Sequence, residues 1–178
     1  MNKMFIKTAA LLAVFLVSSV SFVHSAEKSY VLGAGDKISI KVFGQDDLTI
    51  ESFLGNSGKI NYPFLGEINI AGLSIKAVEQ IITAGLKGDY LVSPNVYAQV
   101  IEYRPFYIHG EVKKPGGYAY HPGMTVNQAV ALAGGLTERA DKDGISLSQE
   151  GDKSNKETAT LDRKVNAGDT ITIEQRFF

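Results

Sequence analysis

Apolar and polar residues alternate in several short runs of this 178-residue chain, which is the period of a strand with one buried face. In the clearest run, Ile38, Ile40 and Val42 fall on one face, while Ser39 and Lys41 alternate with them. Further runs predict strands over residues 48–54, 96–103, 106–112, 118–120, 145–149, 158–161 and 170–175, and two short strands around a turn within 59–70.

A first helix is predicted at residues 73–86, where apolar side chains recur at helical spacing. Ser74 is a favourable N-cap residue, and Gly88 can adopt the left-handed conformation that commonly follows a helix. This helix and the strands around it make a first unit, which we assign to residues 27–103. Its apolar stripe consists of Ile75, Val78, Ile81, Ile82 and Leu86.

A second unit is assigned to residues 104–178. Thr125 is the predicted N-cap of its helix, and Gln128 completes a capping box. Gly134 and Gly135 end this helix. The predicted order of strand, strand, helix, strand, strand suits a β-grasp domain, in which one helix packs across a small mixed sheet. The whole chain is therefore expected to be α+β, with a small mixed β-sheet domain followed by a β-grasp domain.

The N-terminus has the pattern of a signal peptide over residues 1–26. Lys3 and Lys7 precede an uncharged apolar run at 8–23, which is shorter than the roughly 20 residues needed to span a bilayer. Cleavage after residue 25 or 26 is expected, and a retained membrane anchor is the alternative. The protein is then predicted to be periplasmic and associated with the outer membrane.

Composition argues against several partners and modifications. The formal net charge is −1 and no basic block occurs, so a nucleic-acid partner is not expected. The chain has no cysteine, so neither a disulfide nor a lipid-modified cysteine is expected, and the protein is predicted not to be a lipoprotein.

Few residues in the sequence suggest catalysis or metal binding. Asp36 and Asp169 each follow a glycine and precede a strand, so they form either a paired acidic site or, as we favour, two turns whose carboxylates accept backbone N–H groups. His109 and His121 lack a third ligand at short spacing, so no metal is expected. No nucleophile elbow or phosphate loop occurs, so we expect neither catalysis nor a cofactor.

Tyrosines concentrate between residues 90 and 120. Their rings can stack on sugars or lie at subunit contacts, although tyrosine is also simply a favourable strand residue. The candidate glycan or subunit contacts are Tyr97, Tyr103, Tyr107, Tyr118 and Tyr120.

Five segments, in order, carry a resemblance to a known family: 30–44, 58–74, 93–96, 106–116 and 133–137. Together they resemble the polysaccharide biosynthesis/export family, also called outer-membrane polysaccharide export, with one soluble-ligand-binding β-grasp domain. The motif positions are expected to be structural. They are Gly33, Gly35, Asp36, Pro63, Gly66, Pro94, Gly110, Pro115, Gly116, Gly134 and Gly135.

The resemblance implies a periplasmic component of a capsule, exopolysaccharide or biofilm polysaccharide exporter. Such proteins form ring-like homo-oligomers that enclose a passage for polysaccharide, and they work with an inner-membrane polysaccharide co-polymerase. Because the chain ends directly after its last predicted strand, we expect a short-type member that needs a separate outer-membrane β-barrel. A non-conducting glycan-binding adaptor is the main alternative, and a polysaccharide-modifying enzyme is a second one.

Overall fold

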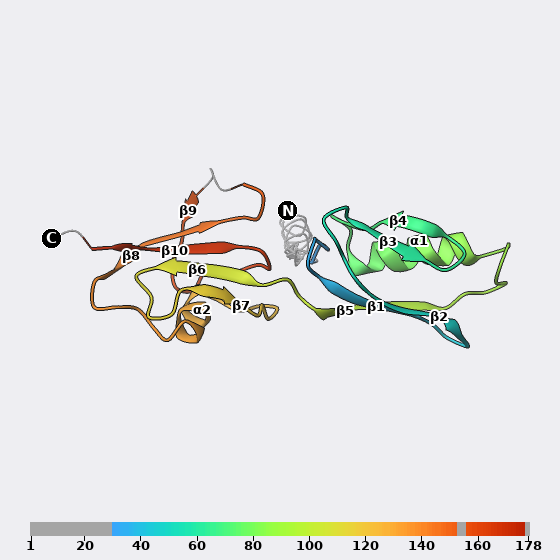
Figure 1. Cartoon of the computed structure of the whole chain (residues 1–178), viewed down its shortest axis with the longest axis horizontal. Helices are drawn as coiled ribbons and strands as arrows, with labels where there is room; N and C mark the ends of the chain where they lie inside the picture. Colours follow the sequence, from blue (N-terminus) through green and yellow to red (C-terminus); the bar gives the residue numbers. More distant parts are fainter. Residues whose placement is uncertain (1–29, 153–155, 177–178) are drawn as a thin grey trace, which may run out of the picture.

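The computed structural model describes residues 30–152 and 156–176, which form two units side by side along the long axis of the molecule (Figure 1). The predicted signal peptide lies outside the described residues. Each unit has its own hydrophobic core, and the chain passes between the units at residues 103–105. The architecture is α+β, with mixed sheets and two helices, as the sequence predicts.

The first unit contains a three-stranded antiparallel sheet in the order β2-β1-β5, a two-stranded hairpin of β3 and β4, and one helix, α1. Its inner face is lined by Ile38, Ile40 and Val42, as predicted, whereas Ser39 on the other face is also buried. The elements are β1 (Lys37–Val42), β2 (Gln45–Phe53), β3 (Lys59–Tyr62), β4 (Gly66–Asn69), α1 (Ile75–Leu86) and β5 (Val96–Glu102).

Strand β2 corrects the prediction of a loop followed by a short strand at 48–54. It begins at Gln45, which pairs with Val42 across a two-residue turn at Phe43 and Gly44. Gly44 has a φ of 79°, a conformation that tight hairpin turns require. Pairing with β1 therefore gives strand structure to a polar segment whose own pattern is weak.

Helix α1 follows the predicted signals. The Ser74 hydroxyl accepts a hydrogen bond from the Ala77 N–H at 3.3 Å, and Gly88 after the helix has a φ of 95°. Val78, Ile82 and Leu86 are buried against the sheet. Ile81 is a correction, since 41% of its surface is exposed although it belongs to the predicted apolar stripe.

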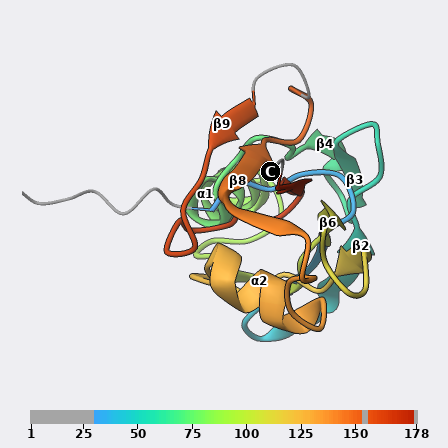
Figure 2. The ribbon, with the colours of Figure 1, turned by 90° about the vertical axis from the view of Figure 1, so that its left-hand side faces the viewer.

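The second unit is a five-stranded sheet in the order β7-β6-β10-β8-β9, in which only the central pair β6 and β10 is parallel. Helix α2 packs against one face (Figure 2). This is the arrangement expected of a β-grasp domain. The elements are β6 (Phe106–Gly110), β7 (Gly116–Tyr118), α2 (Val126–Leu132), β8 (Ala140–Ser148), β9 (Lys156–Thr158) and β10 (Thr170–Gln175).

Several predicted boundaries in this unit are wrong. The strand predicted at 106–112 ends at Gly110, and Gly116 and Gly117 belong to β7 although they were predicted as a turn. The strand predicted at 145–149 starts five residues earlier, at Ala140, and a strand predicted at 158–161 lies at 156–158. Gly110, at which β6 ends, has a φ of 90°. For β7, β8 and β9, hydrogen bonding to a neighbouring strand, which local propensity does not encode, sets the boundary.

Candidate functional site

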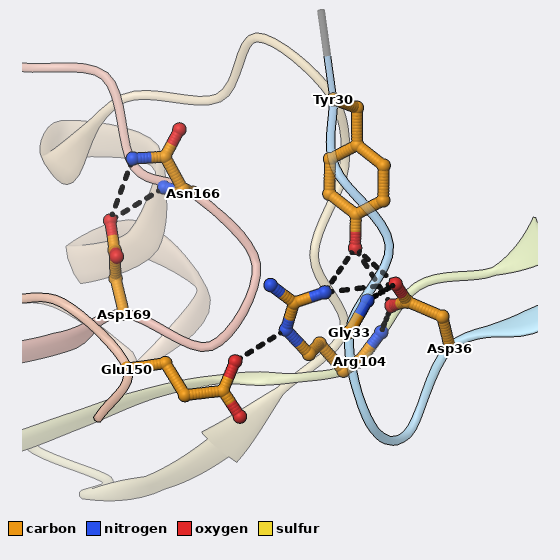
Figure 3. Close-up of polar contacts among 7 residues, drawn as sticks. All are labelled: Tyr30, Gly33, Asp36, Arg104, Glu150, Asn166 and Asp169. Carbon is orange, nitrogen blue, oxygen red and sulfur yellow. Dashed lines mark hydrogen bonds and ion pairs between the residues drawn. The ribbon is translucent and has the colours of Figure 1, made fainter. Parts of the chain in front are cut away.

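The most extensively bonded polar cluster joins the two units and is centred on Arg104 (Figure 3). Arg104 lies in the connection between β5 and β6. Its Nη1 donates to Asp36 Oδ2 at 2.8 Å and to the Tyr30 hydroxyl at 2.7 Å, and its Nε donates to Glu150 Oε2 at 2.7 Å. One side chain thus holds partners from both units.

Asp36 is fully buried. Its carboxylate accepts hydrogen bonds from the Gly33 N–H at 2.9 Å, the Arg104 N–H at 2.9 Å and the Tyr30 hydroxyl at 2.7 Å, besides the Arg104 guanidinium. The bond to Gly33 confirms the turn interpretation. The bonds to Arg104 add a role that the turn pattern does not indicate, because a buried carboxylate is costly unless it is paired and fully hydrogen-bonded.

Glycines make room for the Arg104 side chain. A Cβ on Gly33 would lie 2.6 Å from Arg104 Nη1, and a Cβ on Gly168 would lie 2.5 Å from Glu150 Oε2 and 3.0 Å from Arg104 Nε. Gly35 has a φ of 95° and lies next to the Arg104 Cβ. The Ala-Gly-Asp turns at 34–36 and 167–169 therefore approach the same arginine from the two units.

Asp169 does not share these partners. Its carboxylate accepts from the Asn166 N–H at 2.7 Å and from Asn166 Nδ2 at 3.2 Å, and Figure 3 shows it on the other side of Arg104 from Asp36. Burial raises the pKa of Asp169, while the bonds from Asn166 act in the opposite direction. The paired acidic site considered from the sequence is not formed, and each aspartate closes its own turn.

Three tyrosine rings pack beside Arg104. The Tyr30 and Tyr103 rings lie edge to face with centroids 4.9 Å apart, and Tyr103 meets Tyr120 in the same way at 5.5 Å. Burial raises the pKa of all three phenols, and the Asp36 carboxylate adds to the effect at Tyr30. Tyr120 is only 8% exposed and belongs to the hydrophobic core of the second unit.

The other candidate tyrosines lie elsewhere. Tyr97 is 46% exposed in β5 and Tyr107 is 50% exposed in β6, so the two belong to different sheets. Tyr118 packs against Phe106 and donates its hydroxyl hydrogen bond to the Lys114 carbonyl at 2.6 Å. The five tyrosines proposed from the sequence therefore do not form one continuous surface.

The remaining motif positions lie at turns and element ends. Gly110 has a φ of 90°, and a Cβ there would lie 2.0 Å from the Ile173 carbonyl oxygen. Gly66, Gly134 and Gly135 also have positive φ. The other motif residues are Pro63 in the β3–β4 turn, Pro94 and Pro115 before β5 and β7, and Gly116 at the start of β7.

No metal site is found within residues 30–152 and 156–176, since no group of three or more potential ligands occurs there. His109 Nε2 lies 3.1 Å from Thr172 Oγ1. In the same part of the chain, no helix is long and apolar enough to cross a membrane. An open depression of about 540 Å³ lies beside α2 and is lined by His121, Pro122, Gly123, Met124, Gln128, Ala131 and Leu132.

Sequence reasoning identified Asp36, Gly33 and Gly35 but missed Tyr30, Arg104 and Glu150 as their partners. Tyr30 stands at the start of the motif at 30–44, and Arg104 directly precedes Pro105 at the predicted domain boundary. Arg104 lies 68 positions from Asp36, 74 from Tyr30 and 46 from Glu150, and no local pattern indicates contacts over such separations.

Comparisons with known proteins agree with this two-part organisation. The family described as "Polysaccharide biosynthesis/export protein" matches residues 24–101, and the SLBB domain matches residues 105–156. The chain is 34% identical to the exopolysaccharide production protein ExoF of Rhizobium meliloti over 146 residues, which are 74% of this chain and 34% of ExoF.

Two other relatives also concern polysaccharides. The polysialic acid transport protein KpsD of Escherichia coli is 28% identical over 60% of this chain and 20% of its own length. The EPS I polysaccharide export outer membrane protein EpsA of Ralstonia nicotianae is 28% identical over 83% of this chain and 48% of its own length. The chain thus spans between a fifth and a half of these relatives.

Proposed function

Because this chain belongs to the polysaccharide biosynthesis/export protein family, we propose that it is a periplasmic component of a machine that exports a capsular or extracellular polysaccharide. The relatives are named as polysaccharide production, transport or export proteins, and EpsA as an outer membrane protein. The observation that carries the proposal is the ordered pair of family domains, held together here by Arg104 through partners on both sides.

In this proposal, copies of the chain form a ring, and the polysaccharide passes through its centre towards an outer-membrane pore. A closed ring requires heterologous contacts between neighbouring copies, so each copy must present its two contact surfaces at a fixed angle. The bonds of Arg104 to Asp36 and to Glu150, together with the packing of Tyr30 against both cores, support such a fixed angle, because they tie the first unit to the second. The chain would bind the polymer without cleaving it, so no catalytic group is required.

The proposal includes partners on both sides of the periplasm. An inner-membrane polysaccharide co-polymerase would deliver the polymer, and a separate outer-membrane β-barrel would complete the passage. A non-conducting, glycan-binding adaptor is the second candidate function. The solvent-exposed ring of Tyr107 could contact a glycan in either an adaptor or a conduit. The two functions differ in assembly, because a conduit needs a closed ring and an adaptor does not.

The first test removes the gene from its host and measures secreted polysaccharide. Loss of secretion, restored by the wild-type gene, is expected; unchanged secretion would contradict a role in export. Native mass spectrometry of the purified protein, alone and with the co-polymerase and barrel, then separates the two candidates. A discrete closed oligomer supports the conduit, whereas a monomer under all these conditions would leave the adaptor.

A further inference from the structure

The five-stranded sheet of the second unit has a face that points away from α2. Side chains alternate along a strand, so the residues between buried core positions project from this opposite face. On β6, for example, Phe106 and Ile108 are buried against α2, while Tyr107 and His109 are exposed on the other side. We call this side the hydroxyl face. Tyr107 and His109 are its exposed part, and Thr170 and Thr172 beside them are half-buried. Ser146 and Ser148 continue the face on β8, where Ser148 is buried.

Strand register arranges these side chains in two rows. Thr170 pairs with Tyr107 on one neighbouring strand and with Ser148 on the other. Thr172 pairs in the same way with His109 and with Ser146. Since neighbouring strands are about 4.8 Å apart, each row extends about 10 Å across three strands. Hydroxyl groups thus form a regular array beside an aromatic ring, although the residues come from three distant parts of the sequence.

Tyr107 provides a flat apolar surface at one side of the array. It pairs with Gly117 of β7, and a Cβ on Gly117 would lie 3.1 Å from the Tyr107 ring. Because Gly117 has no side chain, one side of the Tyr107 ring rests on the backbone, while half of Tyr107 stays exposed. The C–H-bearing face of a pyranose ring can pack against such an aromatic surface, as apolar groups do on other tyrosines.

The hydroxyl groups have hydrogen-bonding capacity that the protein does not use. Ser146 Oγ is the only buried side-chain polar atom without a hydrogen-bond partner in the described parts of the chain. Among the described residues, Thr172 Oγ1 has His109 Nε2 as its only hydrogen-bond partner. A serine or threonine hydroxyl both donates and accepts, as a sugar hydroxyl does. The chemistry of the array therefore matches that of a polyhydroxylated ligand.

The charge pattern favours a neutral ligand over a polyanion. The two rows contain no acidic side chain, lysine or arginine. Lys156 lies beyond Ser148 on β9, Glu174 comes two residues after Thr172 on β10, and Glu150 comes two residues after Ser148, so charges of both signs border the rows. A polyanion would find no concentration of positive charge here.

We propose that the hydroxyl face is a binding surface for neutral, polyhydroxylated polysaccharide, with Tyr107 as the stacking platform. Thr172, which is half-buried next to the exposed His109, supplies hydrogen bonds beside it. This inference rests on the proposed function, because it identifies where the exported polymer contacts the chain. Binding is weak at each sugar and is repeated along the polymer, which permits the polysaccharide to slide over the protein.

Affinity electrophoresis tests this with the intact protein, whatever its oligomeric state. Native gels contain dextran as a neutral polyhydroxylated probe, and parallel gels contain polygalacturonate as a charged one. We expect dextran to retard the wild-type protein. Tyr107→Ala should raise the apparent Kd for dextran about five-fold, in line with the loss of one aromatic contact. Thr172→Val, which keeps the side-chain shape, should raise it about two- to three-fold.

Tyr97→Ala is the matched control, because Tyr97 is exposed to a similar extent on the other sheet. It should leave the retardation unchanged, and circular dichroism should show that all variants are folded. The inference is overturned if dextran does not retard the protein, if Tyr97→Ala weakens binding as much as Tyr107→Ala, or if polygalacturonate binds more tightly and independently of Tyr107. These results leave the proposed export function intact, since that function fails only if gene deletion leaves secretion unchanged.

Discussion

At the scale of single residues, Arg104 has the largest set of polar contacts. Its side chain is 12% exposed and bonds three side chains, while its backbone N–H bonds a fourth oxygen, Asp36 Oδ1. Asp36 is completely enclosed, whereas Glu150 is about half exposed. The ion pair with Asp36 therefore matters more for stability than the ion pair with Glu150, because water screens the latter.

Replacement of Arg104 should show how much the buried ion pair with Asp36 contributes to stability. We expect Arg104→Gln to lower the free energy of unfolding by about 3–5 kcal/mol, because the buried Asp36 carboxylate loses its cation. Arg163→Gln is the control, since Arg163 forms an exposed pair with Glu157 and should cost about 1 kcal/mol or less. Urea unfolding measures both variants. Equal losses of unfolding free energy in the two variants would show that the buried Asp36 carboxylate does not need Arg104 as its cation.

Asp169 gives a prediction about pH. Burial raises its pKa above the ordinary value of 3.8, so the folded state binds the proton more tightly than the unfolded state. The stabilisation from protonation is complete below pH 3.8 and is lost as the pH rises through the folded pKa. Asp169→Asn carries no charge at any of these pH values, and its Oδ1 can still accept from Asn166.

The stability of Asp169→Asn relative to wild type should therefore decrease as the pH falls from 7 towards 3.8. Urea unfolding at a series of pH values measures this difference. An exposed carboxylate, Asp47→Asn, provides the comparison. A constant difference between Asp169→Asn and wild type would contradict the raised pKa.

At the scale of elements, short structures depend on specific terminal contacts. Helix α2 has only seven residues, and its capping box joins the Thr125 side chain to the Gln128 N–H and the Gln128 side chain to the Thr125 N–H. We expect Thr125→Ala to cost about 1 kcal/mol, and Thr125→Ser to restore most of it because the hydroxyl remains. Thermal unfolding distinguishes them, and identical behaviour would argue against the cap.

The pairing of β6 with β10 depends on a glycine. Gly110→Ala places a Cβ 2.0 Å from the Ile173 carbonyl oxygen at a φ of 90°, so the strands must separate locally. Gly66→Ala also has a positive φ, but no atom lies within 4 Å of its Cβ, so it should cost only about 1–2 kcal/mol. We expect Gly110→Ala to cost clearly more in a chemical unfolding experiment. A similar cost for both would mean that strand contact is unimportant at Gly110.

At the scale of the whole molecule, the two cores are coupled through aromatic packing. Tyr30 packs against both hydrophobic cores, and its ring meets Tyr103 and Tyr120. Unfolding one unit therefore exposes surface on the other. We expect wild type to unfold in a single calorimetric transition, and Tyr30→Ala, which removes about 2 kcal/mol of packing, to separate it into two. Tyr97→Ala should keep one transition; two transitions in wild type would contradict the coupling.

The sequence by itself determined the α+β class, both helices with their caps, and the last strand, because these follow from local signals. Alternation at 170–175 reproduced β10, and Thr125 with Gln128 located α2. The ordered motifs indicated the family. Gly33, Gly35 and Asp36 were identified as turn residues because glycine conformation and an aspartate beside a turn are also local properties.

Only the tertiary structure decided what these residues contact. Asp36 and Arg104 are 68 positions apart, and their ion pair depends on how the two units fold and meet. The short strands β7 and β9 form because a neighbouring strand supplies hydrogen bonds, so their own sequences carry little signal. The tyrosines are equivalent in the sequence but differ in space, because burial depends on the packing of distant elements. Tyr120 is enclosed at the junction, whereas Tyr107 is half exposed on β6.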